Sequence, residues 1–216
     1  MSFFTAKKNY NFPKNWVPFA ANSTADEISS KLNGYFERMA DDSTRLQSAK
    51  TLLRNCNPEL NIGWPVNFIK DCTRTLQTPD SKLALVMQLE EKFSRCSKRQ
   101  MNVADRISAA CYIGTDKAII CLLASDYKGA ASINSGTIEF NIVELQMDSL
   151  RVLAVEKLLE FDRRLGSKFL RSMIIALFKC WERVAPAFAD GNRASYCLSI
   201  IDSHLKSLIS ARAKEL

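Results

Sequence analysis

The fold is decided first by residues 23–54, which read STADEISSKLNGYFERMADDSTRLQSAKTLLR. Apolar side chains recur here mostly at alternating intervals of four and three residues: Ile28, Leu32, Tyr35, Met39, Leu46, Ala49 and Leu53. That spacing places them on one face of an α-helix. A hydroxyl residue, Ser23 or Thr24, precedes two acidic residues, an order typical of a helix N-terminus. The stretch predicts one long amphipathic helix, or two helices broken near Asp41-Asp42-Ser43.

Residue signals farther along the chain delimit additional helices. Thr78-Pro79-Asp80 places a capping residue before a proline, which predicts a helix that begins there and runs to about Arg99. Comparable patterns predict helices over residues 65–76, 148–165, 168–184 and 192–212. The 216 residues hold only seven Gly and six Pro, fewer than a many-stranded sandwich needs for its turns. Helices should therefore dominate.

The middle of the chain fits more than one structure. Residues 102–125 fit a pair of helices joined near Gly114, which we favour, but they also fit a β-hairpin. Residues 137–145 alternate loosely between apolar and polar side chains, which predicts a strand. No internal repeat is visible in the sequence. We therefore expect a mainly α, compact helical fold of one or two lobes, with at most one short strand or hairpin in the middle.

The expected organisation has four parts. An extended N-terminal arm, residues 1–22, precedes a helical N-terminal lobe over residues 23–126. Residues 127–146 form a loop and the candidate strand, and residues 147–216 form a helical C-terminal lobe.

The chain carries a formal net charge of +7, and that charge is unevenly distributed. Residues 1–22 carry +3 without any acid, residues 61–106 carry +3, and residues 151–216 carry +5. Residues 107–150, by contrast, carry −3. A basic excess of this kind favours polyanionic partners, either nucleic acid or an anionic membrane surface.

Targeting signals and cysteine usage indicate a reducing compartment. We see no secretory signal and no apolar run of the roughly 20 residues that a transmembrane segment needs. The seven cysteines include no Cys-x-x-Cys pair, and only one histidine accompanies them, so a zinc site is not expected. We interpret the cysteines as small buried apolar residues of a cytoplasmic protein.

No arrangement of residues predicts catalysis. His204, the only histidine, follows Cys197 by two helical turns, roughly 10 Å, too far for a nucleophile–base hydrogen bond. No glycine-rich phosphate-binding motif occurs. The acidic pairs Asp41-Asp42 and Glu90-Glu91 diverge on their helices and are expected to be solvated. We therefore expect a protein that is not an enzyme and needs no metal or other cofactor.

Two clusters of cations are the candidate nucleic-acid contacts. Both are rich in arginine, whose guanidinium makes forked hydrogen bonds to phosphate oxygens. No acid lies within residues 92–99 or 163–171. Such runs also occur simply because cations stabilise helix C-termini. The candidate residues are Lys92, Arg95, Lys98, Arg99 and Arg106 in the first cluster, and Arg163, Arg164, Lys168 and Arg171 in the second.

The N-terminal arm combines aromatic side chains with positive charge. Pro13 and Pro18 favour an extended backbone, so these rings cannot easily be buried by local helix formation. The arm can pack on its own domain, dock on a neighbouring copy, or stack on nucleobases. Its candidate oligomerisation residues are Phe3, Phe4, Tyr10, Phe12, Trp16 and Phe19.

These features predict a non-enzymatic protein that binds single-stranded RNA without sequence preference and self-associates. It would be a viral structural protein of the coat or nucleocapsid type, forming a homo-oligomer. A helical adaptor for protein partners is the main alternative, because the apolar stripes of the first and last helices could form a groove. Peripheral association with a membrane through the same cations and the aromatic arm is a third alternative.

Overall fold

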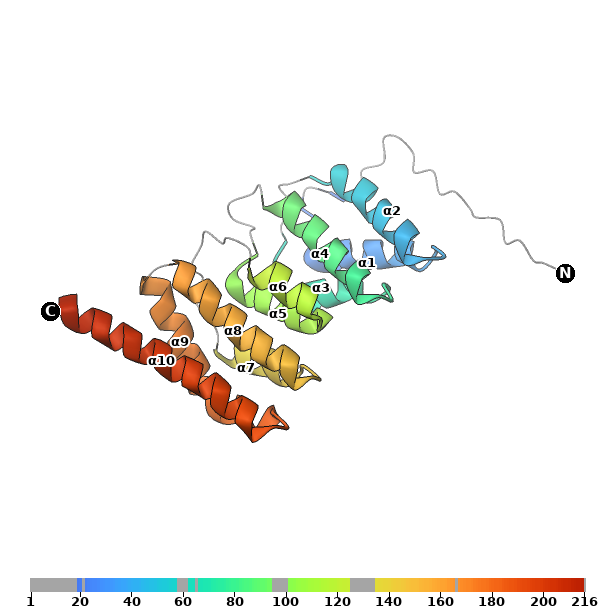
Figure 1. Cartoon of the computed structure of the whole chain (residues 1–216). Helices are drawn as coiled ribbons and strands as arrows, with labels where there is room; N and C mark the ends of the chain where they lie inside the picture. The colour runs from blue at the N-terminus through green and yellow to red at the C-terminus, as the bar shows by residue number, and fades with distance from the viewer. Residues whose placement is uncertain are drawn as a thin grey trace. The chain divides into compact units, whose positions relative to one another are not determined.

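The computed structural model describes residues 19, 20, 22–57, 62–64, 66–94, 101–124, 135–165 and 167–215. Within these ranges the chain forms ten α-helices, which Figure 1 labels, one short 3-10 helix, η1 (Ala185–Ala187), and no strand. The predicted mainly α fold is therefore confirmed. The chain divides into two units, Met1–Gln100 and Met101–Leu216.

The first unit contains α1 (Ala25–Phe36), α2 (Asp42–Arg54), α3 (Val66–Thr73) and α4 (Pro79–Phe93). α1 packs on α3, and α2 packs on α4. The long apolar stripe forms two helices, because α1 ends at Phe36 and the Asp41 side chain accepts the Thr44 amide to cap α2. Trp64 contributes to the core, with its ring edge-on to Phe93 at 5.7 Å.

The second unit contains the remaining six helices. They are α5 (Val103–Ile113), α6 (Asp116–Leu123), α7 (Ser135–Val143), α8 (Asp148–Leu165), α9 (Ser167–Val184) and α10 (Gly191–Glu215). Residues 102–125 contain the predicted helix pair rather than a hairpin. Gly114 ends α5 with φ 68°, a left-handed conformation that glycine adopts without steric cost.

The predicted strand over residues 137–145 is wrong. Ile138, Ile142 and Leu145 are buried, whereas Phe140 is 56% exposed. Buried positions separated by four and three residues follow the period of a helix, and a strand would have buried Phe140 together with Ile138 and Ile142. Ile138 and Ile142 therefore pack on one face of α7, and Leu145 is buried just beyond its end.

The boundary between the two units differs from the expected one. We expected residues 23–126 to form one lobe, but the division lies between Gln100 and Met101. The reason is packing: α5 contacts α6 and α7, and α6 contacts α8. Five of the six cysteines that the structure describes are buried, as expected, but Cys121 is exposed, and Cys96 lies outside the described residues.

An aspartate and an arginine at the start of α2 tie together three parts of the first unit. The Asp42 carboxylate pairs with Arg45 at 3.0 Å and accepts the backbone amides of Gln77 and Thr78, just before α4. The Arg45 guanidinium donates to three backbone carbonyls, those of Phe36, Met39 and Thr75. Asp42 is therefore a structural group, and the expectation that it is solvated is corrected.

The second unit repeats this arrangement at the start of α8. Asp148 pairs with Arg151 at 2.8 Å and accepts the backbone amides of Ala189 and Asp190, just before α10. Arg151 donates to the carbonyl of Val143, at the end of α7, and to that of Ala187. Each of these contacts has a counterpart in the first unit, and we call the two arrangements the Asp–Arg clamps.

The helices around the two clamps also pack alike. α7 packs on α9 as α1 packs on α3, and α10 packs on α8 and α9 as α4 packs on α2 and α3, although α8 also packs on α9 whereas α2 does not pack on α3 to a comparable extent. The sequence Asp-Ser-x-Arg opens both α2 and α8, and Leu-Leu follows at Leu52-Leu53 and Leu158-Leu159, all of which are buried. The chain therefore contains a four-helix repeat, α1–α4 and α7–α10, which the sequence did not reveal.

We predict that breaking the clamp of the first unit lowers the stability of the protein. Arg45→Met should lower the free energy of unfolding by about 2–4 kcal/mol, because several partly buried carbonyls and the Asp42 carboxylate lose their donor. Urea unfolding followed by circular dichroism measures the change. Arg38→Met, at an exposed position outside the clamp, is the control, and an equal cost for both variants would contradict the assignment.

We also expect the stability contributed by the Asp42 carboxylate to depend on pH. Burial by itself raises its pKa, but the amides of Thr78 and Gln77, with Ser81 and Arg45, lower the pKa from 3.8 to about 2. The unfolded chain then binds more protons, so this stabilisation is present above about pH 4 and is lost as the pH falls toward about 2. The stability difference between the unaltered protein and Asp42→Asn should therefore shrink over that interval, measured by urea unfolding. A stability difference between the two proteins that stays constant from about pH 4 to about pH 2 would contradict this prediction.

Candidate anion-binding groove

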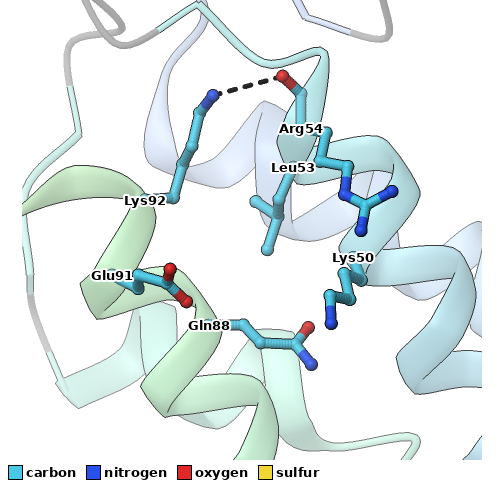
Figure 2. Close-up of a pocket in the computed structure, with 6 residues that line it drawn as sticks. All are labelled: Lys50, Leu53, Arg54, Gln88, Glu91 and Lys92. Carbon is cyan, nitrogen blue, oxygen red and sulfur yellow. Dashed lines mark hydrogen bonds between the residues drawn. The ribbon is translucent and has the colours of Figure 1, made fainter.

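A groove between α2 and α4 gathers three cations in the first unit. It has a volume of about 240 Å³ and is lined by Lys50, Leu53, Arg54, Gln88, Glu91 and Lys92. Figure 2 shows that the residues come from the two helices and surround a shared hollow. Small-molecule sites typically measure roughly 300–1,000 Å³, so this groove suits a single charged group better than an enclosed substrate.

The clamp explains why these cations meet. It joins the start of α2 to the start of α4, so the two helices run parallel and their C-terminal ends lie together. Lys50 and Arg54 are separated by one helical turn on α2 and are both exposed. Lys92 occupies the last turn of α4, across the groove from Arg54.

One contact in the groove has an ordinary structural role. The Lys92 ammonium donates to the carbonyl oxygen of Arg54 at 3.3 Å, as Figure 2 shows. A cation at a helix C-terminus offsets the partial negative charge of the exposed carbonyls. Those carbonyls disfavour an anion, so attraction must come from the side chains. Three cations against the single carboxylate of Glu91 leave the groove positive.

The amide of Gln88 adds an orphaned polar atom to the groove. Its side-chain oxygen is buried and accepts no hydrogen bond from the residues that the structure describes. Figure 2 shows the Gln88 and Lys50 side chains extending toward each other. A buried acceptor without a donor costs about 1–3 kcal/mol, which a bound hydroxyl group could relieve.

The predicted residues of the first cation cluster do not all lie at one site. Lys92 lies in the groove, but Arg95, Lys98 and Arg99 lie outside the described residues. Arg106 is only 6% exposed, and its guanidinium donates to the carbonyl of Leu122 inside the second unit. It therefore presents no charge at the surface, and we leave it out of the candidate interface.

The second cluster is only partly described. Arg163 is exposed on α8, near His204 of α10. The structure describes the backbone at Arg164, Lys168 and Arg171 but not their side chains. Sequence reasoning missed Lys50 and Arg54, although their spacing of four residues on a predicted helix was the available signal.

The N-terminal arm has one member within the described residues. Phe19 is 2% exposed, and the ammonium of Lys31 lies 5.9 Å from the centre of its ring. This ring therefore belongs to the core of the first unit and is not a free anchor. Phe3, Phe4, Tyr10, Phe12 and Trp16 lie outside the described residues.

The residues considered for catalysis belong to the second unit, whereas the groove belongs to the first. Burial, and then the nearby charge of Arg163, lowers the pKa of His204. Burial also raises the pKa of the Cys197 thiol to about 11, with a contribution from Glu156. A neutral thiol is a poor nucleophile at neutral pH.

Metal-binding clusters and membrane-spanning helices are both absent from the residues that the structure describes. No group of three or more His, Cys, Asp or Glu side chains there is placed to hold a metal ion. None of the helices described is long and apolar enough to cross a membrane. Comparison of the chain with protein-family models, curated proteins and solved structures finds no match.

Proposed function

We propose that the protein binds single-stranded RNA through its phosphates, without catalysis and without reading sequence, and that it self-associates like a coat or nucleocapsid protein. The observation that carries the proposal is the groove in which Lys50, Arg54 and Lys92 face one carboxylate. Cations at this density attract the phosphate backbone whatever the base sequence. The net charge of +7 acts in the same direction.

The geometry favours RNA over a small anionic metabolite. The groove is open and shallow for a substrate pocket, and its cations come from one end of two parallel helices. The orphaned Gln88 oxygen adds an acceptor beside them, which a ribose hydroxyl could satisfy. A polymer would reach further cations along the chain, whereas a single small anion would contact the groove alone.

The first experiment measures binding to a fluorescein-labelled oligouridylate by fluorescence anisotropy at increasing salt. We expect affinity to fall steeply between about 50 and 200 mM salt, because bound cations release counterions from the RNA. An affinity that does not change with salt, or no binding at low salt, would refute the proposal.

Apolar residues on the second unit favour a helical adaptor as the second candidate. Among the residues that the structure describes, the exposed large apolar side chains of the first unit comprise only Met87. Those of the second unit are Ile120, Phe140, Val143, Met147, Ile175, Phe178, Tyr196, Leu198 and Ile209. Where exposed apolar side chains form one contiguous patch, they are typical of surfaces that contact other proteins.

The absorbance ratio at 260 and 280 nm of freshly purified protein separates these candidates. Copurified nucleic acid supports RNA binding, and a ratio typical of pure protein supports the adaptor. Flotation with anionic liposomes tests the third alternative, peripheral membrane association, which RNA binding does not predict.

A further inference from the structure

The two clamps align α2 with α8 residue by residue. With Asp42 matched to Asp148, the buried residues Ser48, Ala49, Leu52 and Leu53 match the buried residues Ala154, Val155, Leu158 and Leu159. Lys50 then corresponds to Glu156, and Arg54 corresponds to Glu160. Both cations that α2 contributes to the groove are thus replaced by carboxylates in the second repeat.

The same correspondence extends along α4 and α10. Thr75, Gln77 and Thr78 contact the first clamp as Ala187, Ala189 and Asp190 contact the second. Continuing along the helices pairs buried Leu85 and Leu89 with buried Cys197 and Ile201. Gln88 then corresponds to Ile200, and Lys92 corresponds to His204.

Both carboxylates of the second repeat have local partners. Glu156 accepts a hydrogen bond from the Tyr196 hydroxyl at 3.1 Å, and Glu160 pairs with Lys157 at 2.7 Å. The lowered pKa of His204 leaves its imidazole largely uncharged at neutral pH. A phosphate at this position would therefore meet the Glu156 carboxylate and the Glu160–Lys157 ion pair in place of two cations, and Arg163 adds a positive charge near His204.

We propose that the two repeats have diverged at one surface: the surface between α2 and α4 binds the phosphate backbone, and Glu156 and Glu160 exclude it from the equivalent surface between α8 and α10. This inference rests on the proposed RNA-binding function. It names the two specificity-determining residues and predicts a second binding surface that is present in the scaffold but blocked by charge.

The test is a gain of binding in the full-length chain. Glu156→Lys with Glu160→Arg should raise affinity for the fluorescein-labelled oligouridylate about tenfold at low salt. The slope of log affinity against log salt should steepen by about 1.4, since each added contact to single-stranded nucleic acid contributes about 0.7. The matched control is Glu144→Lys with Glu182→Arg, which makes the same charge change at exposed positions of the same unit.

The background variant Lys50→Glu with Arg54→Glu sharpens the comparison. In the Lys50→Glu with Arg54→Glu background, Glu156→Lys with Glu160→Arg should restore RNA binding. The control pair, Glu144→Lys with Glu182→Arg, should not. Equal gains from the two pairs would overturn the inference, because net charge alone would then explain them. The variant Glu156→Lys with Glu160→Arg could lose its helical circular-dichroism signal. In that case Glu160→Arg alone is compared with Glu144→Lys, because Glu160→Arg leaves the Glu156–Tyr196 hydrogen bond in place.

The outcomes also separate this inference from the proposed function. An unaltered protein that shows no salt-sensitive RNA binding would overturn the proposed function and this inference with it. A second outcome would overturn only the divergence of the repeats. In it, Lys50→Glu with Arg54→Glu lowers the affinity for RNA, but the substitutions at 156 and 160 raise the affinity no more than the control substitutions do.

Discussion

Reversing the three cations of the groove should lower the affinity for single-stranded RNA on the order of 100-fold at about 50 mM salt. The variant is Lys50→Glu with Arg54→Glu and Lys92→Glu, and fluorescence anisotropy with a labelled oligouridylate measures the loss. Each lost phosphate contact should flatten the slope of log affinity against log salt by about 0.7, hence by about 2 for all three. The loss should not depend on base sequence, because phosphates carry no sequence information.

A matched variant controls for net charge. Arg38→Glu with Arg74→Glu and Lys82→Glu makes the same charge change in the first unit but leaves the groove lining untouched. We expect this control to weaken binding severalfold at most. Comparable losses in both variants would show that the groove is not the site. Because Lys92 also caps α2, Lys50→Glu with Arg54→Glu keeps that contact and should still lose most of the affinity.

Local signals were sufficient to predict most of the helices. Thr24, Thr78 and Asn102 each accept a backbone amide at the start of a helix, and such caps are readable from sequence. α7 was misread because its short apolar segment fits both periods loosely, and its packing on α5 and α9 decides between them. Neither contact is visible in a local window of sequence.

The groove could be predicted only in part, because it depends on which helices become neighbours. Lys92 stood out as part of a run of cations, but Lys50 and Arg54 lie 38 or more residues away in sequence. The packing of α2 on α4, with the contact of Asp42 at the start of α4, brings the two helices together. The run of cations also suggested Arg106, whose guanidinium turns inward to the Leu122 carbonyl.

The repeat escaped the sequence analysis for a related reason. Its two copies share Asp-Ser-x-Arg and Leu-Leu, but little else is identical between α2 and α8. Their third helices also differ in length, since α3 has 8 residues and α9 has 18. A fixed period is therefore absent from the sequence, and the correspondence rests on hydrogen bonds and burial.

Deleting residues 1–18 should lower the oligomeric mass of the protein at least twofold while leaving its helical circular-dichroism signal intact. The deletion stops before Phe19 because that ring is buried in the first unit and removing it would destabilise the core. The deleted segment contains five aromatic residues. Burying each of them on a neighbouring copy would contribute about 1.5–3 kcal/mol to the free energy of association. Light scattering after size exclusion measures the mass.

Two full-length variants then separate the roles of rings and charges in the arm. Replacing Phe3, Phe4, Tyr10, Phe12 and Trp16 by Ser should reproduce the loss of mass, because apolar burial holds the copies together. Replacing Lys7, Lys8 and Lys14 by Gln should leave the mass unchanged and flatten the salt dependence of RNA binding. Eighteen extended residues span about 60 Å, enough to reach an adjacent copy. An unchanged mass in the ring variant would mean that the arm packs on its own chain, and self-association would then require another surface.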